Sequence, residues 1–167
     1  MPYLRGEEEK PDGCVFCHKR SCSDPEAHIL IRGEYCYVTL NRYPYSNGHL
    51  MVIPYAHVCS LEALETPALT EMMLMVNLSL AALREAYAPH GFNLGMNLGK
   101  AAGAGIAEHV HMHIVPRWTA DTNFMPVVGE TRVIPELLDE AFARLQPIFA
   151  RLIETQYRHL KHCQADQ

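Results

Sequence analysis

Histidine alternates with an apolar residue along the stretch His109-Val110-His111-Met112-His113-Ile114-Val115. Because successive side chains of a β-strand point to opposite faces, a strand here would place its three histidines on one face, about 7 Å apart. The apolar residues between them would then cover the other face and enter the core. The pattern therefore predicts a half-buried strand, ended by Pro116, whose outer face consists of imidazoles.

Three aligned imidazoles point to chemistry more than to packing. Neutral imidazole is a nucleophile near pH 7, and a glycine-rich stretch over residues 99–105 comes shortly before the histidines. Backbone N–H groups of such a loop can hold phosphate oxygens, so the pattern favours attack on phosphorus by one histidine. A metal centre held by three histidines is the competing interpretation, since His-x-His pairs on a strand also bind zinc or iron.

The rest of the sequence predicts an α+β domain around this strand. Apolar periodicity and turn residues predict strands over 35–40, 49–53 and 92–98 and helices over 67–87 and 135–157. The first two strands flank a turn-forming stretch and are expected to form a hairpin. Several strands with two helices inserted among them are typical of an α+β architecture.

The organisation along the chain is simple. Residues 1–13 carry charge, proline and glycine without periodicity and are expected to form a flexible lead-in. Residues 14–157 are expected to form one domain, and residues 158–167 a short tail. A chain of 167 residues is long enough to bury a sizeable core.

Composition narrows the class of protein. The formal net charge of −5 argues against a general nucleic-acid binder, whose binding surface would be basic. No apolar run approaches the roughly 20 residues that span a bilayer, and the acidic N-terminus lacks the pattern of a signal peptide. We therefore expect a cytoplasmic protein with neither a nucleic-acid nor a membrane partner. In that compartment the pair Cys14 and Cys17, a CxxC, indicates metal or redox chemistry more than a disulfide.

The histidine stretch resembles the signature of the histidine-triad family. Upstream, Leu40-Asn41-Arg42-Tyr43-Pro44 and Gly48-His49-Leu50-Met51-Val52-Ile53-Pro54 resemble the nucleoside-binding hairpin of that family. The resemblance covers about residues 14–117. Through residues 116–118 and 121–124 it looks closest to bacterial diadenosine tetraphosphate phosphorylases.

This resemblance implies a fold and a reaction. The family fold is a five-stranded antiparallel sheet with two main helices, usually as a homodimer. Its chemistry is attack on the α-phosphorus of a nucleotide to give a nucleotidyl-histidine, which water or phosphate then cleaves. The implied partners are adenine nucleotides or dinucleoside polyphosphates, with inorganic phosphate as an acceptor, and no organic cofactor is implied.

The family's functional positions carry over to individual residues. His111, the middle histidine, matches the nucleophile, and His113 and His49 match positions that stabilise charge on the phosphates. Asn41 matches the residue that bonds the ribose hydroxyls. The positions that contact phosphate oxygens match Asn97, Gly103, Ala104 and Gly105. Tyr45, in the turn of the hairpin, is expected either to line the base pocket or to cover the core.

Two departures from the family pattern bear on activity. Many members carry a polar side chain just before the triad, whereas residues 103–106 of this chain offer none. The segment 97–109 is also one residue longer than usual. A nucleoside phosphoramidate hydrolase of the same family is the alternative enzyme, and the missing polar residue favours a nucleotide-binding module with little turnover. Retention of all three histidines argues against that module.

A second site follows from the resemblance. Some members bind a structural zinc through a CxxC, a histidine after the second hairpin strand and the first triad histidine. The matching residues here are Cys14, Cys17, His57 and His109. Two cysteines and two histidines form a closed tetrahedral zinc site with no open position for chemistry. His18, Cys22 and His28 lie nearby as competing ligands.

Overall fold

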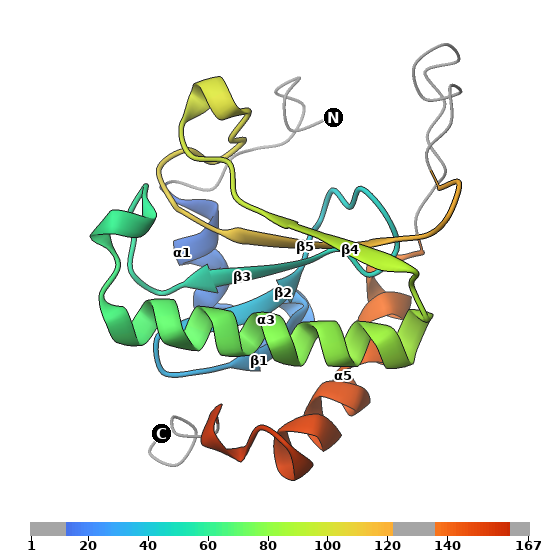
Figure 1. The fold of residues 1–167 in the computed structure, drawn as a ribbon. Helices are drawn as coiled ribbons and strands as arrows, with labels where there is room; N and C mark the ends of the chain where they lie inside the picture. The colour runs from blue at the N-terminus through green and yellow to red at the C-terminus, as the bar shows by residue number, and fades with distance from the viewer. Residues whose placement is uncertain (1–12, 122–135, 161–167) are drawn as a thin grey trace.

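A five-stranded antiparallel sheet forms the centre of the computed structural model, which describes residues 13–121 and 136–160 (Figure 1). The strand order is β1-β2-β3-β5-β4. The strands are β1 (Ile29–Arg32), β2 (Cys36–Leu40), β3 (Leu50–Pro54), β4 (Gly91–Gly95) and β5 (Met112–Arg117). The sheet confirms the predicted α+β class. The predicted lead-in, except for Gly13, and the last seven residues of the tail lie outside the described residues.

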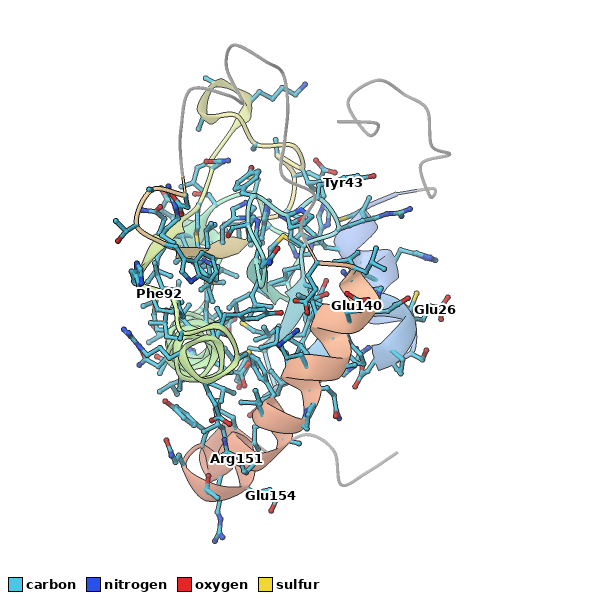
Figure 2. All side chains as sticks on the ribbon, turned by 90° about the vertical axis from the view of Figure 1, so that its right-hand side faces the viewer. Glu26, Tyr43, Phe92, Glu140, Arg151 and Glu154 are labelled. Atoms are coloured by element: carbon cyan, nitrogen blue, oxygen red, sulfur yellow. The ribbon has the colours of Figure 1, made fainter. Side chains whose placement is uncertain are left out.

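Two long helices accompany the sheet, as predicted. The helices are α1 (Val15–Arg20), α2 (Asp24–Ala27), α3 (Thr66–Tyr87) and α5 (Leu138–Thr155). Single 3-10 turns occupy Leu61–Ala63, Lys100–Ala102 and Arg158–Leu160. Figure 2 looks along α3, with α5 beside it. Both pack against the same apolar cluster of the sheet, while the short α1 and α2 belong to the opposite face.

Alternation along the strands divides the core into two clusters. On one face, residues such as Val38, Val52 and Ile114 pack with α3 and α5. On the other face, Tyr37 and Ile53 pack with side chains of α1 and α2. The second cluster covers β1, β2 and β3, whereas the half of that face over β5 and β4 lines an open cavity. That open half is where the histidine strand presents its polar side chains.

The predicted hairpin is confirmed, and its turn explains a glycine. β2 and β3 pair in register from Cys36 opposite Pro54 to Leu40 opposite Leu50. Gly48 adopts φ +69, and a Cβ atom there would lie 2.8 Å from the ring of Tyr87. The turn therefore needs glycine both for its backbone conformation and for its close approach to α3.

Helix α3 is the one helix of the described residues that is long and apolar enough to cross a membrane by length and composition alone. In this fold, however, Met72, Met75 and Leu78 of α3 are fully buried in the main cluster. The apolar character of α3 is accounted for by its place in the core of the domain.

The histidine strand starts later than the sequence predicts. β3 pairs with β5 from Val52 opposite Met112 to Leu50 opposite Ile114, so the segment His109–His111 has no strand opposite it. Val110 instead donates its N–H to the carbonyl of Val58 at 2.7 Å. The prediction of a strand from His109 is therefore wrong, although Val110 and Ile114 are buried as predicted.

The predicted end of the strand is also wrong, because β5 continues through Pro116 to Arg117. The carbonyl of Pro116 accepts a hydrogen bond from Ser46 Oγ at 2.9 Å, on the side where β3 no longer pairs. Proline is tolerated there because no neighbouring strand needs its missing N–H. Similarly, the strand predicted over 92–98 ends at Gly95.

Candidate active site and metal cluster

The structure brings the three predicted catalytic histidines together. His49 directly precedes β3, His111 directly precedes β5, and His113 lies in β5 opposite Met51. The ring centroids of His111 and His113 are 4.7 Å apart, and those of His49 and His113 are 5.1 Å apart. His49 and His111 are buried, while His113 is half-buried and lines the open cavity.

A backbone carbonyl determines which nitrogen of His111 is available. Nδ1 of His111 lies 2.9 Å from the carbonyl oxygen of His109. Because a carbonyl only accepts hydrogen bonds, Nδ1 carries the proton and Nε2 carries the lone pair. Burial lowers the pKa of His111, which favours this neutral form. Nε2 is therefore the nitrogen of His111 that has a lone pair available.

A chain of hydrogen bonds determines the protonation of the other two histidines. The N–H of Tyr45 donates to Nδ1 of His49 at 3.1 Å, so the proton of neutral His49 is on Nε2. That Nε2 lies 3.0 Å from Nδ1 of His113 and donates to it, which leaves the proton of neutral His113 on Nε2.

Both of these imidazoles are neutral at neutral pH. Burial, reinforced by the neighbouring His113 and His111, lowers the pKa of His49 to about 3. Burial and His111 lower the pKa of His113 to about 4. At neutral pH neither ring therefore carries a positive charge, and of the two only His113 has an N–H group, on Nε2, that is not already donated within the pair.

Asn41, the predicted ribose contact, lies beside this cluster. Its Nδ2 is 3.3 Å from Nδ1 of His49, and its Oδ1 accepts the N–H of Tyr43 at 3.0 Å. The turn thus holds the amide in place at the end of β2. Asn41 therefore lies next to His49, and its role towards a ribose stays a prediction.

The predicted phosphate contacts divide into two groups. Asn97 lines the same cavity as His113. Gly103, Ala104 and Gly105 follow the 3-10 turn in an open loop and are not among the described residues that line that cavity. Their role towards phosphate stays a prediction.

The sequence did not indicate a role for Phe16, and it left two roles possible for Tyr45, lining the base pocket or covering the core. The ring of Phe16 lies 4.8 Å from that of His111 and 5.5 Å from that of His109. Tyr45 acts through its backbone N–H, which no side-chain pattern reveals. The position of Phe16 between the two cysteines is the one signal that links it to the histidines.

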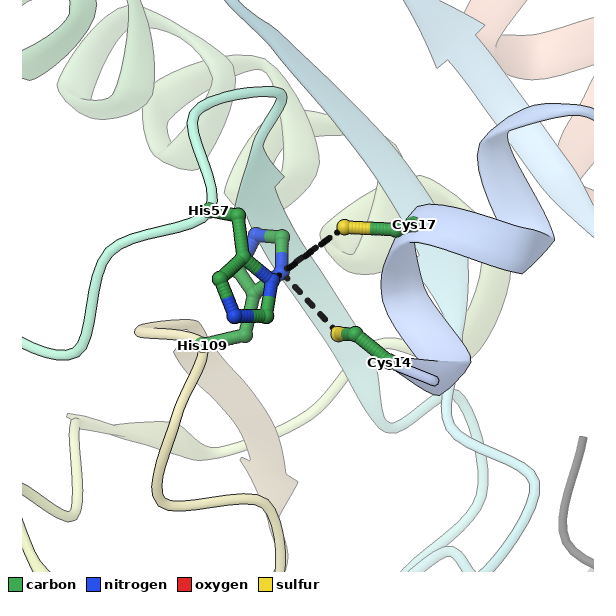
Figure 3. A group of neighbouring side chains, drawn as sticks. All are labelled: Cys14, Cys17, His57 and His109. Atoms are coloured by element: carbon green, nitrogen blue, oxygen red, sulfur yellow. Dashed lines mark hydrogen bonds between the residues drawn. The ribbon is translucent and has the colours of Figure 1, made fainter. Parts of the chain in front are cut away.

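The predicted metal ligands converge from three separate segments (Figure 3). Their ligand atoms all lie within 4.8 Å of one another in the cluster Cys14, Cys17, His57 and His109. Nδ1 of His109 is 3.3 Å from Sγ of Cys14 and 3.7 Å from Sγ of Cys17. Sulfur and nitrogen ligands of a tetrahedral zinc are about 3.6 Å apart, so the cluster fits that ion.

The other nitrogen of His109 supports the same conclusion. Nε2 of His109 donates to the carbonyl of Pro54 at 2.9 Å, which leaves the lone pair of Nδ1 facing the cysteines. Because His109 faces Cys14 while His111 uses its Nδ1 on a carbonyl, the geometry does not support a centre of three histidines. This cluster is the one group of three or more potential metal ligands found within residues 13–121 and 136–160.

The competing ligands are engaged elsewhere. Nε2 of His28 pairs with Asp139 at 2.8 Å, which joins the end of α2 to the start of α5. Nε2 of His18 lies 4.0 Å from Sγ of Cys22, and neither residue belongs to the cluster. The ligand set proposed from the resemblance is thus the set that the structure brings together.

Comparison with known proteins agrees with the geometry. The profile of the HIT domain matches residues 23–120, more than half of the chain. The chain belongs to the histidine-triad (HIT) family. AP-4-A phosphorylase of Mycobacterium tuberculosis is 43% identical over 129 residues, which is 77% of this chain. The match spans 66% of the length of that relative.

Two further proteins illustrate the range of similarity. Adenylylsulfatase HINT3 of Arabidopsis thaliana is 35% identical over 108 residues, which is 65% of this chain and 54% of the relative. A zinc-bound histidine-triad protein of Mycobacterium smegmatis superposes with a TM-score of 0.69 at 26% identity. That match covers 86% of this chain and 98% of the solved structure.

The low pKa of His49 predicts a pH dependence of stability. The pKa of about 3 in the folded state lies below the ordinary 6.5, so the unfolded chain binds the proton more readily between these values. The stability that depends on neutral His49 is fully present above pH 6.5. As the pH falls towards 3, the free energy of unfolding decreases by about 1.4 kcal/mol per pH unit. Urea unfolding of the parent and of His49→Gln should be measured from pH 7 to pH 4. The free energy of unfolding should fall less steeply with pH in the variant, by the equivalent of about one bound proton. Equal slopes would contradict the buried, neutral state of His49.

Proposed function

We propose that this protein cleaves adenine dinucleoside polyphosphates at the α-phosphorus, with phosphate ahead of water as the acceptor. The observation that carries the proposal is the lone pair on Nε2 of His111, presented next to His113 and its Nε2–H group. The 43% identity to a protein named AP-4-A phosphorylase supports the substrate class.

The reaction proceeds in two displacements. Nε2 of His111 attacks the α-phosphorus, and the bond to the bridging oxygen breaks with its electron pair on the departing nucleotide. The Nε2–H group of His113 donates to an oxygen of the phosphoryl group as negative charge develops. An oxygen of inorganic phosphate then attacks the same phosphorus, the N–P bond breaks, and ADP and neutral His111 result.

The missing polar side chain before the triad favours polyphosphate substrates over phosphoramidates. Residues 103–106 supply no side chain that could donate a proton to the leaving atom. An amine must gain a proton to depart, whereas a polyphosphate oxygen departs as a stable anion. The leaving group of diadenosine tetraphosphate is ATP, which can therefore depart without a proton donor from this loop.

A second candidate is hydrolysis of other AMP-linked compounds. The specific support is the 35% identity to a protein named adenylylsulfatase. A nucleoside phosphoramidate would undergo the same first step at His111. The homodimer and the cytoplasmic location stay predictions from the sequence.

Product analysis on diadenosine tetraphosphate tests the proposal. With inorganic phosphate the parent should release ADP and ATP, and His111→Ala should lose at least about a thousandfold in rate, because no other group replaces the nucleophile. His90→Ala, which changes an exposed histidine, serves as the matched control. AMP formed without phosphate would identify a hydrolase with the same nucleophile. Turnover by His111→Ala equal to that of the parent would contradict the assignment.

We further propose that the Cys14, Cys17, His57 and His109 cluster binds one zinc ion with a structural role. The ion would join α1 to the loop after β3 and to the segment that carries His111. All four ligands come from the chain, so no position remains open for substrate. Phe16 lies between the two cysteines in sequence, so the metal would also hold its ring against His111.

Metal analysis of protein purified without chelators should give one zinc per chain. Cys17→Ser should lose the metal and several degrees of thermal stability, because the metal stabilises the folded state that presents its ligands. Cys59→Ser provides the control, since Cys59 is exposed and lies outside the cluster. Zinc content unchanged in Cys17→Ser, or absent from the parent even after zinc is supplied, would contradict this proposal.

A further inference from the structure

A cavity of about 430 Å³ lies over the open half of the sheet, beside the histidines. It extends along one face of β5, from His113 through Val115 to Arg117. The strand rises about 3.3 Å per residue, so Arg117 lies about 13 Å along β5 from His113. The remaining lining comprises Tyr45, Ser46, Asn93, Leu94, Gly95, Met96, Asn97 and Asp121. Its volume is of the size that small-molecule ligands occupy.

This cavity and the ribose position at Asn41 are different places. Asn41 is not among the described residues that line the cavity, yet both adjoin the linked pair of His49 and His113. A nucleotide held at Asn41 with its α-phosphorus at His111 would therefore have its leaving group free to enter the cavity. The polyphosphate chain of a dinucleotide is long enough to carry a second nucleoside along β5.

The charges in the cavity favour a neutral group at its far end. The guanidinium of Arg117 forms two hydrogen bonds with Asp121, at 2.6 and 2.7 Å, and a third with Asn93 at 2.7 Å. The carboxylate balances the cation, so this end does not offer the net positive charge that a phosphate binds. Asn93 lies opposite Val115 on β4, and its side-chain amide is suited to the edge of a base.

Tyr45 supplies an aromatic surface along the cavity, beside His113, and the next residue, Ser46, is bonded to the carbonyl of Pro116. Its side chain is 59% exposed although it is large and aromatic. Its ring lies 6.1 Å from the ring of His113 at an angle of 26°, and 4.7 Å from that of His49. Because its backbone N–H is bonded to His49, the position of Tyr45 relative to the histidines is fixed. An exposed aromatic ring on an anchored backbone offers a face on which a nucleobase can stack.

We propose that this cavity binds the second nucleoside of a dinucleoside polyphosphate, the one that leaves, and that Tyr45 stacks on its base. The inference rests on the proposed function and specifies how the enzyme distinguishes a dinucleotide from a mononucleoside polyphosphate. Tyr45 acts as a specificity-determining residue, while His111 and His113 act on the phosphorus whichever compound is bound.

The test compares diadenosine tetraphosphate with adenosine 5′-tetraphosphate. Both compounds carry the same α-phosphorus and the same chain of four phosphates, and they differ by the second adenosine alone. The parent should have a kcat/KM at least about tenfold higher for the dinucleotide. Tyr45→Ala should lose most of that preference, so that the ratio of kcat/KM for the dinucleotide to kcat/KM for adenosine tetraphosphate falls towards one.

Two controls separate stacking from damage to the histidines. Tyr45→Phe keeps the ring and should keep the preference, and Met73→Ala truncates an exposed apolar side chain of α3 away from the cavity and should match the parent. Equal kcat/KM values for the two compounds in the parent, or an equal loss for both in Tyr45→Ala, would overturn the subsite and leave the proposed function standing. A parent that turns over neither compound would instead contradict the proposed function.

Discussion

The hydrogen bond from Nδ1 of His111 to the carbonyl of His109 is the interaction on which the site depends. A neutral imidazole has one proton, so a bond that holds it on Nδ1 leaves the lone pair on Nε2. The carbonyl is held in turn because the ring of the same residue, His109, lies between the carbonyl of Pro54 and the cysteines. The candidate nucleophile and the candidate metal cluster are therefore one continuous structure.

The two faces of the sheet contribute differently: one carries the main core, and the other carries the candidate active site. The face packed with α3 and α5 supplies the main core, while α1 and α2 cover part of the other face. The open half over β5 and β4 then presents His113 next to a cavity. His113 receives its hydrogen bond from His49, which in turn is bonded to the backbone of the hairpin turn, so the orientation of the His113 ring is tied to the sheet.

The sequence predicts those elements whose signal is periodic or repeats a family motif. The hairpin, α3, α5 and the convergence of Cys14 with His109 follow from such signals. The start of β5 does not, because alternation of side chains continues through His109–His111 although no strand lies opposite them. β1 has four residues and α2 also four, too few for periodicity to reveal them. The hydrogen bond from the N–H of Tyr45 to His49 is donated by a backbone group, so the type of residue at position 45 does not predict it.

Hydrogen bonds from and to backbone groups fix the tautomers of the three histidines. Long-range ¹H–¹⁵N NMR spectra of protein labelled at histidine, recorded near pH 7, distinguish the two nitrogens of each ring. The structure predicts a protonated Nδ1 and a bare Nε2 for His111, and the reverse for His49 and His113. A protonated Nε2 on His111 would contradict this assignment, because that nitrogen would then have no lone pair with which to attack phosphorus.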